Sequence, residues 1–94
     1  DLRVETLADR AMMSPRNFAR AFRRETGMTP GTYVETLRLE RARQLLEGPP
    51  GPIDGIAVQC GFGTPETMRR SFARRLGVSP AEYRRRFRRE PAEV

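Results

Sequence analysis

The feature that most constrains this chain is an internal repeat, in which the second half matches the first at an offset of 50 residues. The matched pairs are Ser14-Pro15 with Thr64-Pro65, Phe18 with Met68, Arg20 with Arg70, Phe22 with Phe72, Arg24 with Arg74, Gly27 with Gly77, Thr29-Pro30 with Ser79-Pro80, and Tyr33 with Tyr83. Upstream of these pairs the offset is 49, which places Ala11 opposite Cys60 and makes Gly63 an inserted residue. The repeat predicts two copies of one small unit.

Each copy has the pattern of a helix-turn-helix. In the second copy, apolar residues at 53, 56, 57 and 60 indicate a short helix, and Gly61 and Gly63 allow the positive φ angles of a sharp turn. Thr64 is a good N-cap, and Pro65 suits the first helical position because its missing N–H is not needed there. Met68, Phe72 and Leu76 then give the next helix one apolar face. Two helices joined by a tight turn describe a helix-turn-helix.

The first copy repeats these signals. Apolar residues at 4, 7, 8 and 11 predict a short helix, and Met12-Met13 form the turn. A second helix is expected from Pro15 to about Thr26, with Phe18, Ala21 and Phe22 buried and Gly27 ending it.

The two copies are joined by a long predicted helix. It begins at Thr29-Pro30 and ends before the Gly48–Pro52 run, and its roughly 17 residues would span about 25 Å. A last helix is expected from Ser79-Pro80 through Tyr83 and Phe87. We therefore predict an all-α fold and one domain, 1–94, with subdomain 1 at about 3–29 (helix-turn-helix 4–26), a linker helix at about 30–47 and subdomain 2 at about 52–90 (helix-turn-helix 53–76).

Charge and composition favour a polyanionic partner. The net charge is +6, and all 18 basic residues are arginine, which suits bidentate contacts to phosphate and guanine. A GC-rich genome is an alternative explanation for the choice of arginine over lysine, but it does not explain the net charge. With no histidine, one cysteine and no phosphate-binding loop, the sequence predicts no enzyme, no metal and no cofactor. No apolar run is long enough to span a membrane, so we expect a cytoplasmic protein.

Candidate DNA-reading residues lie in the first turns of the second helix of each unit. In the first copy, Arg16 and Arg20 are candidates for hydrogen bonds to guanine, and Asn17 is a candidate for hydrogen bonds to adenine. In the second copy, Arg69 and Arg70 are the corresponding candidates for base contacts. Glu66 has two interpretations: it accepts a hydrogen bond from cytosine, or it serves the helix dipole and pairs with nearby arginines. The outer faces differ between the copies, which fits helices that meet different bases, although a merely solvated face would also diverge.

Other polar residues are candidates for phosphate contacts, since helix N-termini and arginine side chains both attract phosphate. They are Ser14, Arg23, Arg24, Thr64, Arg74 and Arg75. The linker arginines Arg38, Arg41 and Arg43 alternate with glutamates, and a salt-bridged surface is the expected role for them.

These residues resemble the DNA-binding domain of the AraC/XylS family of transcriptional regulators. The second copy carries Ile56-Ala57, Cys60-Gly61-Phe62, Phe72, Gly77-Val78-Ser79-Pro80 and Tyr83-Arg84, and the first carries Leu7-Ala8, Met13-Ser14-Pro15, Phe22, Gly27-Met28-Thr29-Pro30 and Arg38-Leu39-Glu40-Arg41-Ala42. The resemblance implies seven helices, the first of them before this sequence begins, and two recognition helices in successive major-groove segments. The base-facing positions that it implies are Arg16, Ala19 and Arg20, and Glu66, Arg69 and Arg70. It also implies a missing N-terminal effector or dimerisation domain, and RNA polymerase as a partner of the full-length regulator.

The resulting prediction is sequence-specific binding of double-stranded DNA by a bacterial transcriptional regulator. An activator is predicted rather than a repressor. Two alternatives remain open at this point. The first alternative is a nonspecific nucleic-acid-binding domain. The second is a helical protein-interaction module.

Overall fold

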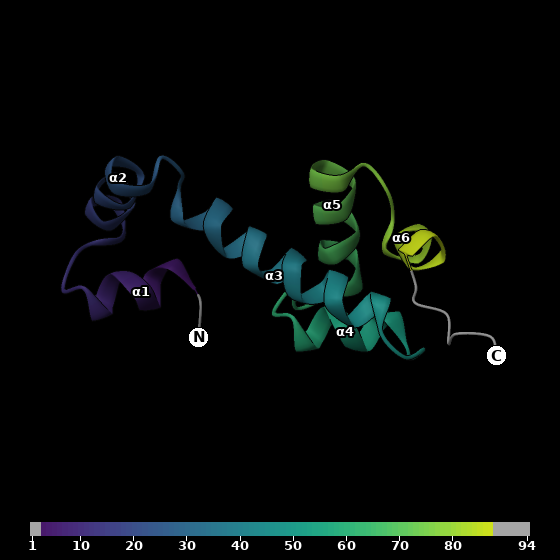
Figure 1. Cartoon of the computed structure of the whole chain (residues 1–94). Coiled ribbons are helices and arrows are strands. Elements are labelled where there is room, and N and C mark those ends of the chain that lie inside the picture. Colours follow the sequence, from purple (N-terminus) through teal and green to yellow (C-terminus); the bar gives the residue numbers. More distant parts are fainter. Residues whose placement is uncertain (1–2, 88–94) are drawn as a thin grey trace. The chain divides into compact units, whose positions relative to one another are not determined.

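The computed structural model describes residues 3–87, which form helices and connecting turns (Figure 1). The helices of this range are α1 (Val4–Arg10), α2 (Pro15–Thr26), α3 (Pro30–Glu47), α4 (Ile53–Gln59), α5 (Pro65–Leu76) and α6 (Pro80–Phe87). The predicted all-α fold is confirmed. None of these helices is long and apolar enough to cross a membrane. Residues 88–90, which we expected in subdomain 2, lie outside the described range.

The chain divides into two compact units, Asp1–Leu37 and Arg38–Val94, and the division falls inside α3. The first unit holds α1, α2 and the start of α3, and the second holds the rest of α3 with α4, α5 and α6. The resemblance implied a seventh helix ahead of these, and it has no counterpart within residues 3–87.

The second helix of each helix-turn-helix begins and ends in the same way, as the repeat predicts. The hydroxyl of Ser14 accepts a hydrogen bond from the N–H of Asn17 at 3.2 Å, and that of Thr64 accepts from the N–H of Thr67 at 3.1 Å. Such a cap satisfies one of the N–H groups that a helix leaves unpaired in its first turn. At the other end the chain leaves the helix at Gly27 (φ 81°) and Gly77 (φ 74°), in the left-handed region that glycine adopts without strain.

The second unit has a well-buried core. Its members come from all four helices and from the turn between α4 and α5: Leu39, Ala42, Leu46, Ile56, Ala57, Cys60, Phe62, Met68, Phe72 and Tyr83. Phe72 and Met68 are fully buried, so the apolar face predicted for α5 lies in this core. The core thereby fixes which side of α5 faces solvent.

Polar contacts tie α6 to the rest of the second unit. The hydroxyl of Tyr83 donates a hydrogen bond to the carboxylate of Glu47 at 2.5 Å and accepts one from Nε of Arg43 at 3.1 Å. The guanidinium of Arg84 donates to the backbone carbonyl of Gly51 at 2.7 Å, which attaches α6 to the loop after α3.

The first unit is less deeply packed than the sequence predicted. Phe18, Ala21 and Phe22 are half-buried rather than buried, although Phe22 stacks against Phe18 and Tyr33 with ring centroids 5.8 and 5.5 Å apart. The reason is the number of elements available. In the second unit three further helices contribute to the core around α5, whereas the described part of the first unit offers α2 only α1 and the start of α3.

Candidate nucleic-acid interface

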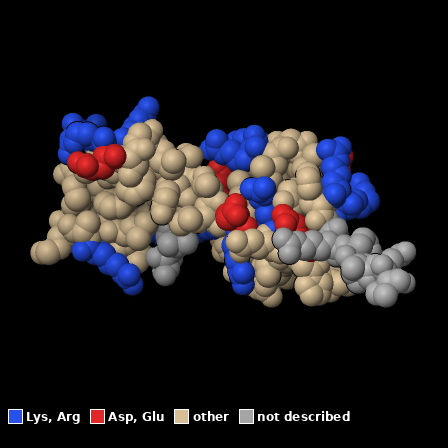
Figure 2. Space-filling model, viewed as in Figure 1, with Lys and Arg blue, Asp and Glu red and all other residues tan. Residues whose placement is uncertain are grey.

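The outer face of α2 is rich in cations. Arg16, Asn17, Arg20, Arg23 and Arg24 are all exposed. Within residues 3–87, none of these four arginines forms an ion pair or a hydrogen bond through its side chain. Figure 2 shows basic side chains gathered over the region of α2, with acidic atoms beside them. This face therefore presents guanidinium groups whose donors are available to an anionic partner.

Ala19 differs in exposure from the other residues predicted to face the bases on α2. Ala19, which the resemblance assigns to the base-facing set, is half-buried. It lies between the exposed arginines and the apolar stripe of α2, as its position on the helix requires.

The outer face of α5 differs because its arginines already have a partner. Glu66 pairs with Arg69 (Oε2 to Nη2, 2.7 Å) and with Arg70 (Oε1 to Nε, 3.6 Å). All three side chains are more than half exposed, and solvent therefore keeps these ion pairs weak. The carboxylate of Glu66 thus forms ion pairs with both arginines that are candidates for base contacts on α5. This arrangement agrees with the ion-pairing interpretation of Glu66.

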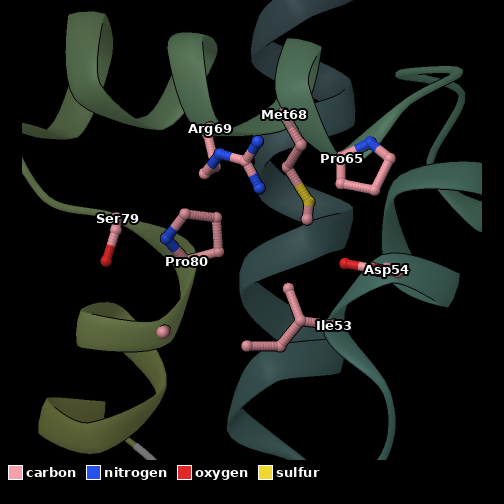
Figure 3. A pocket seen from close by; sticks show the side chains of 8 residues that line it. Ile53, Asp54, Pro65, Met68, Arg69, Ser79 and Pro80 are labelled. Carbon is pink, nitrogen blue, oxygen red and sulfur yellow. The ribbon is translucent and has the colours of Figure 1, made fainter.

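Arg69 and Arg70 occupy different parts of the α5 surface. Arg69 lines a pocket of 280 Å³ that is shared by the first turns of α4, α5 and α6. In Figure 3, Met68 and Ile53 point toward one another across this pocket, and Arg69 lies on the side of Ser79 and Pro80. The side chain of Arg70 is 70% exposed against 57% for Arg69. Arg70 is therefore the more exposed of the two.

The remaining predicted phosphate ligands lie at the ends of the two helices. Ser14 and Thr64 use their hydroxyl oxygens as caps, and the Thr64 hydroxyl also donates to Oγ1 of Thr67 at 3.0 Å. The exposed positive ends of α2 and α5, rather than the Thr64 hydroxyl, are what an anion would meet there. Arg74 and Arg75 are exposed in the last turn of α5.

The linker arginines do not all behave as the sequence predicted. Arg43 pairs with Glu40 at 3.3 Å, and Arg41 donates to Oε1 of Gln44 at 3.5 Å. Arg38 has no such partner in the described range and lies against Gly61 instead. The signal for this contact in the sequence was Gly61. Glycine was expected there for its positive φ angle, but it also permits the close approach of a neighbouring side chain.

The described residues offer no site for metal chemistry. No group of three or more His, Cys, Asp or Glu within 3–87 is arranged to hold a metal ion. The lone Cys60 is buried, and burial raises the pKa of its thiol. It fills the position that Ala11 has in the first copy, as a small core side chain.

Comparison with known proteins finds a helix-turn-helix family and transcriptional regulators. Residues 7–86 match the family described as a helix-turn-helix domain. The chain is 55% identical over 85 residues to the HTH-type transcriptional regulator Rv1931c of Mycobacterium tuberculosis, covering 90% of this chain and 33% of that protein. It is 38% identical over 85 residues to the RCS-specific HTH-type transcriptional activator RclR of Escherichia coli, covering 90% and 30%. The chain thus spans about a third of the curated relatives that it matches.

Two solved structures are similar as well. The DNA-binding domain of the global transcriptional factor AdpA, crystallised with a target DNA, has a TM-score of 0.83 and 46% identity over 90% of this chain and 77% of that one. The C-terminal domain of AraT, a response regulator from Geobacillus stearothermophilus, has a TM-score of 0.90 and 30% identity over 100% of this chain and 78% of that one.

Proposed function

The chain belongs to the AraC/XylS family of helix-turn-helix transcriptional regulators, and from this premise we propose that it binds specific sequences of double-stranded DNA. Helices α2 and α5 each enter the major groove, in two segments about one helical turn (~34 Å) apart along the DNA. The proposal places the protein in the bacterial cytoplasm, with the chromosome.

One observation carries the proposal: both units expose an arginine-rich face on the helix that follows the turn. In α5 the opposite face is locked in the core through Met68 and Phe72, so the outward face cannot rotate away from a ligand. In α2 the arginines are free of ion pairs within the described residues. Each of these capped, cationic helices is suited to a groove lined by phosphates and acceptor-rich base edges.

The roles of individual residues follow from their places on these faces. Arg16 and Arg20 of α2 contact guanine O6 and N7, with Asn17 contacting adenine and Ala19 packing beside them. In α5, Arg70 is the principal reader and Arg69 a reader at the edge. Glu66 either accepts from cytosine or holds the two arginines. The proposed phosphate contacts are Arg23, Arg24, Arg74 and Arg75, together with Ser14 and Thr64 at the exposed N-terminal ends of α2 and α5.

The full-length protein is proposed to be an activator. This rests on relatives such as RclR, which is named a transcriptional activator. The chain covers only 30% of that relative, which supports a further domain in the full-length protein. An N-terminal effector or dimerisation domain and a contact with RNA polymerase complete that proposal.

Selection of bound duplexes from a random DNA library tests the function. We expect the 94-residue chain to enrich two short motifs whose centres lie about one helical turn apart. Enrichment of no motif would leave nonspecific phosphate binding as the explanation. Failure to retain any duplex at low salt would instead favour a protein-interaction module.

A further inference from the structure

Arg38 reaches from α3 to the turn of the second helix-turn-helix. A Cβ added to Gly61 would lie 3.1 Å from Nε of Arg38, 3.7 Å from Cζ and 3.8 Å from Cδ. The guanidinium therefore rests on the face of Gly61 that any other residue would fill. Arg38 itself is half-buried.

This arginine differs from its neighbours Arg41 and Arg43 on α3 in having no side-chain partner among residues 3–87. Arg43 is bound to Glu40 and to the hydroxyl of Tyr83, and Arg41 is hydrogen-bonded to Gln44. Within residues 3–87, Arg38 forms neither an ion pair nor a side-chain hydrogen bond. The side chain of Arg38 thus offers guanidinium donors that no described residue uses, and an anion could accept hydrogen bonds from them.

The location of Arg38 indicates which anion. Gly61 precedes the N-cap of α5, Thr64, by three residues, so Arg38 lies against the turn that leads into this helix. In a helix-turn-helix on DNA, the first helix crosses the sugar-phosphate backbone while the second lies in the groove. A cation at the turn between them is therefore at the level of the phosphates.

Among the described residues of the first unit there is no equivalent contact. The repeat places Met12 opposite Gly61, and Met12 is 93% exposed, with no arginine laid over it. Within residues 3–87 the contact between an arginine and the turn therefore occurs in the second unit, and the internal repeat could not have predicted it.

We propose that Arg38, which lies on α3 and packs against Gly61, contacts a phosphate of the DNA backbone beside α5. The inference rests on the proposed DNA-binding function. Because phosphates carry no sequence information, Arg38 contributes affinity and salt dependence but no base preference.

The test compares Arg38→Ala, Arg38→Lys and Arg41→Ala with the unsubstituted chain, on its selected duplex and on a scrambled duplex, across a series of salt concentrations. Arg41→Ala is the matched control, because it removes the same charge from the same helix. We expect Arg38→Ala to weaken binding to both duplexes equally and to reduce the slope of log K against log salt by about 0.9. Arg38→Lys retains the charge and should recover most of the slope.

Other outcomes would overturn the proposal. An unchanged slope in Arg38→Ala would show that the guanidinium only packs against the turn, and thermal unfolding of the same variant would then report the loss. An equal fall in Arg41→Ala would show that any positive charge on α3 acts in this way. If the unsubstituted chain prefers neither duplex, the proposed function fails, whereas loss of the Arg38 effect alone leaves it intact.

Discussion

At the scale of single residues, both turns contain a positive φ angle, but different residue types adopt it. Gly61 has φ 88° and Gly63 has φ 87°, as the sequence predicted, but the first turn places Met12 at φ 58°. A non-glycine residue in this region is strained, because its Cβ crowds the backbone. The sequence did not reveal this strain directly, since methionine is not a residue that marks left-handed turns. The alignment of Met12 with Gly61 was the only indication.

Replacing Met12 with glycine should therefore stabilise the protein. The side chain is 93% exposed, so no packing is lost, and relief of strain should outweigh the added entropy of glycine in the unfolded chain by about 0.5–1 kcal/mol. Denaturant unfolding measures the difference. Met12→Ala is the control, because it keeps the strained φ and should leave stability unchanged. A lower stability for Met12→Gly would show that Met12 is not strained.

Glu66 is the residue whose two interpretations can be separated by one substitution. If it mainly restrains Arg69 and Arg70, Glu66→Gln should release both arginines and tighten binding to every duplex, by several-fold at low salt. Glu82→Gln is a matched control, because Glu82 pairs with Arg86 at 2.9 Å on α6 and carries the same charge. Weaker binding at one base position of the selected site, with scrambled DNA unaffected, would instead support the cytosine contact.

Arg20 and Arg70 occupy equivalent positions in the repeat, and each is expected to read a different half of the site. We expect Arg20→Ala and Arg70→Ala each to cost about 1–3 kcal/mol of binding free energy and to relax base preference in one half-site only. Selection from random DNA with each variant measures this. Uniform weakening across all sequences would show that the two arginines contact phosphates.

At the scale of elements, the helices were predictable because their ends carry local chemistry. The hydroxyl–proline starts at Ser14-Pro15 and Thr64-Pro65 and the glycine ends at Gly27 and Gly77 act within a few residues, and the structure contains each of them. Burial depends instead on what packs from elsewhere in the chain. The spacing of Phe18 and Phe22 correctly predicted an apolar face on α2, but it contained no information on how many helices would cover that face.

The attachment of α6 to α3 also depends on contacts distant in sequence, and it should make stability depend on alkaline pH. Burial and the hydrogen bond to Glu47 raise the pKa of Tyr83 despite the opposing effect of Arg43. Because the folded state holds this proton more tightly than the unfolded state, the stabilisation is complete below the ordinary tyrosine pKa of about 10 and is lost as the pH rises above it.

Tyr83→Phe tests this contact. At neutral pH we expect it to cost about 0.5–1.5 kcal/mol, the usual worth of a hydrogen bond of this kind. Urea unfolding between pH 8 and 11 should show a smaller alkaline loss for Tyr83→Phe than for the unsubstituted chain. The buried thiol of Cys60 also has a raised pKa and titrates in the same direction, so both proteins should carry Cys60→Ala. Equal alkaline losses in the two would contradict the assignment.

At the scale of the whole molecule, the repeat gives one chain two helix-turn-helix units with similar helix ends and different outer faces. The first presents unpaired arginines within the described residues, and the second presents arginines held by Glu66. Sequence reasoning identified these candidate faces because they follow from helical periodicity. It missed Arg38, since the contact with Gly61 joins residues 23 positions apart and belongs to no local motif.

The central claim is that these faces distinguish one DNA sequence from another. The most direct measurement is the ratio of dissociation constants for the selected duplex and for a scrambled duplex of equal length and composition, at about 150 mM salt. For sequence-specific binding we expect a ratio of at least about 10³, with the preference retained as salt rises. A ratio near one, with both affinities falling in parallel as salt increases, would show that the arginines only neutralise phosphate.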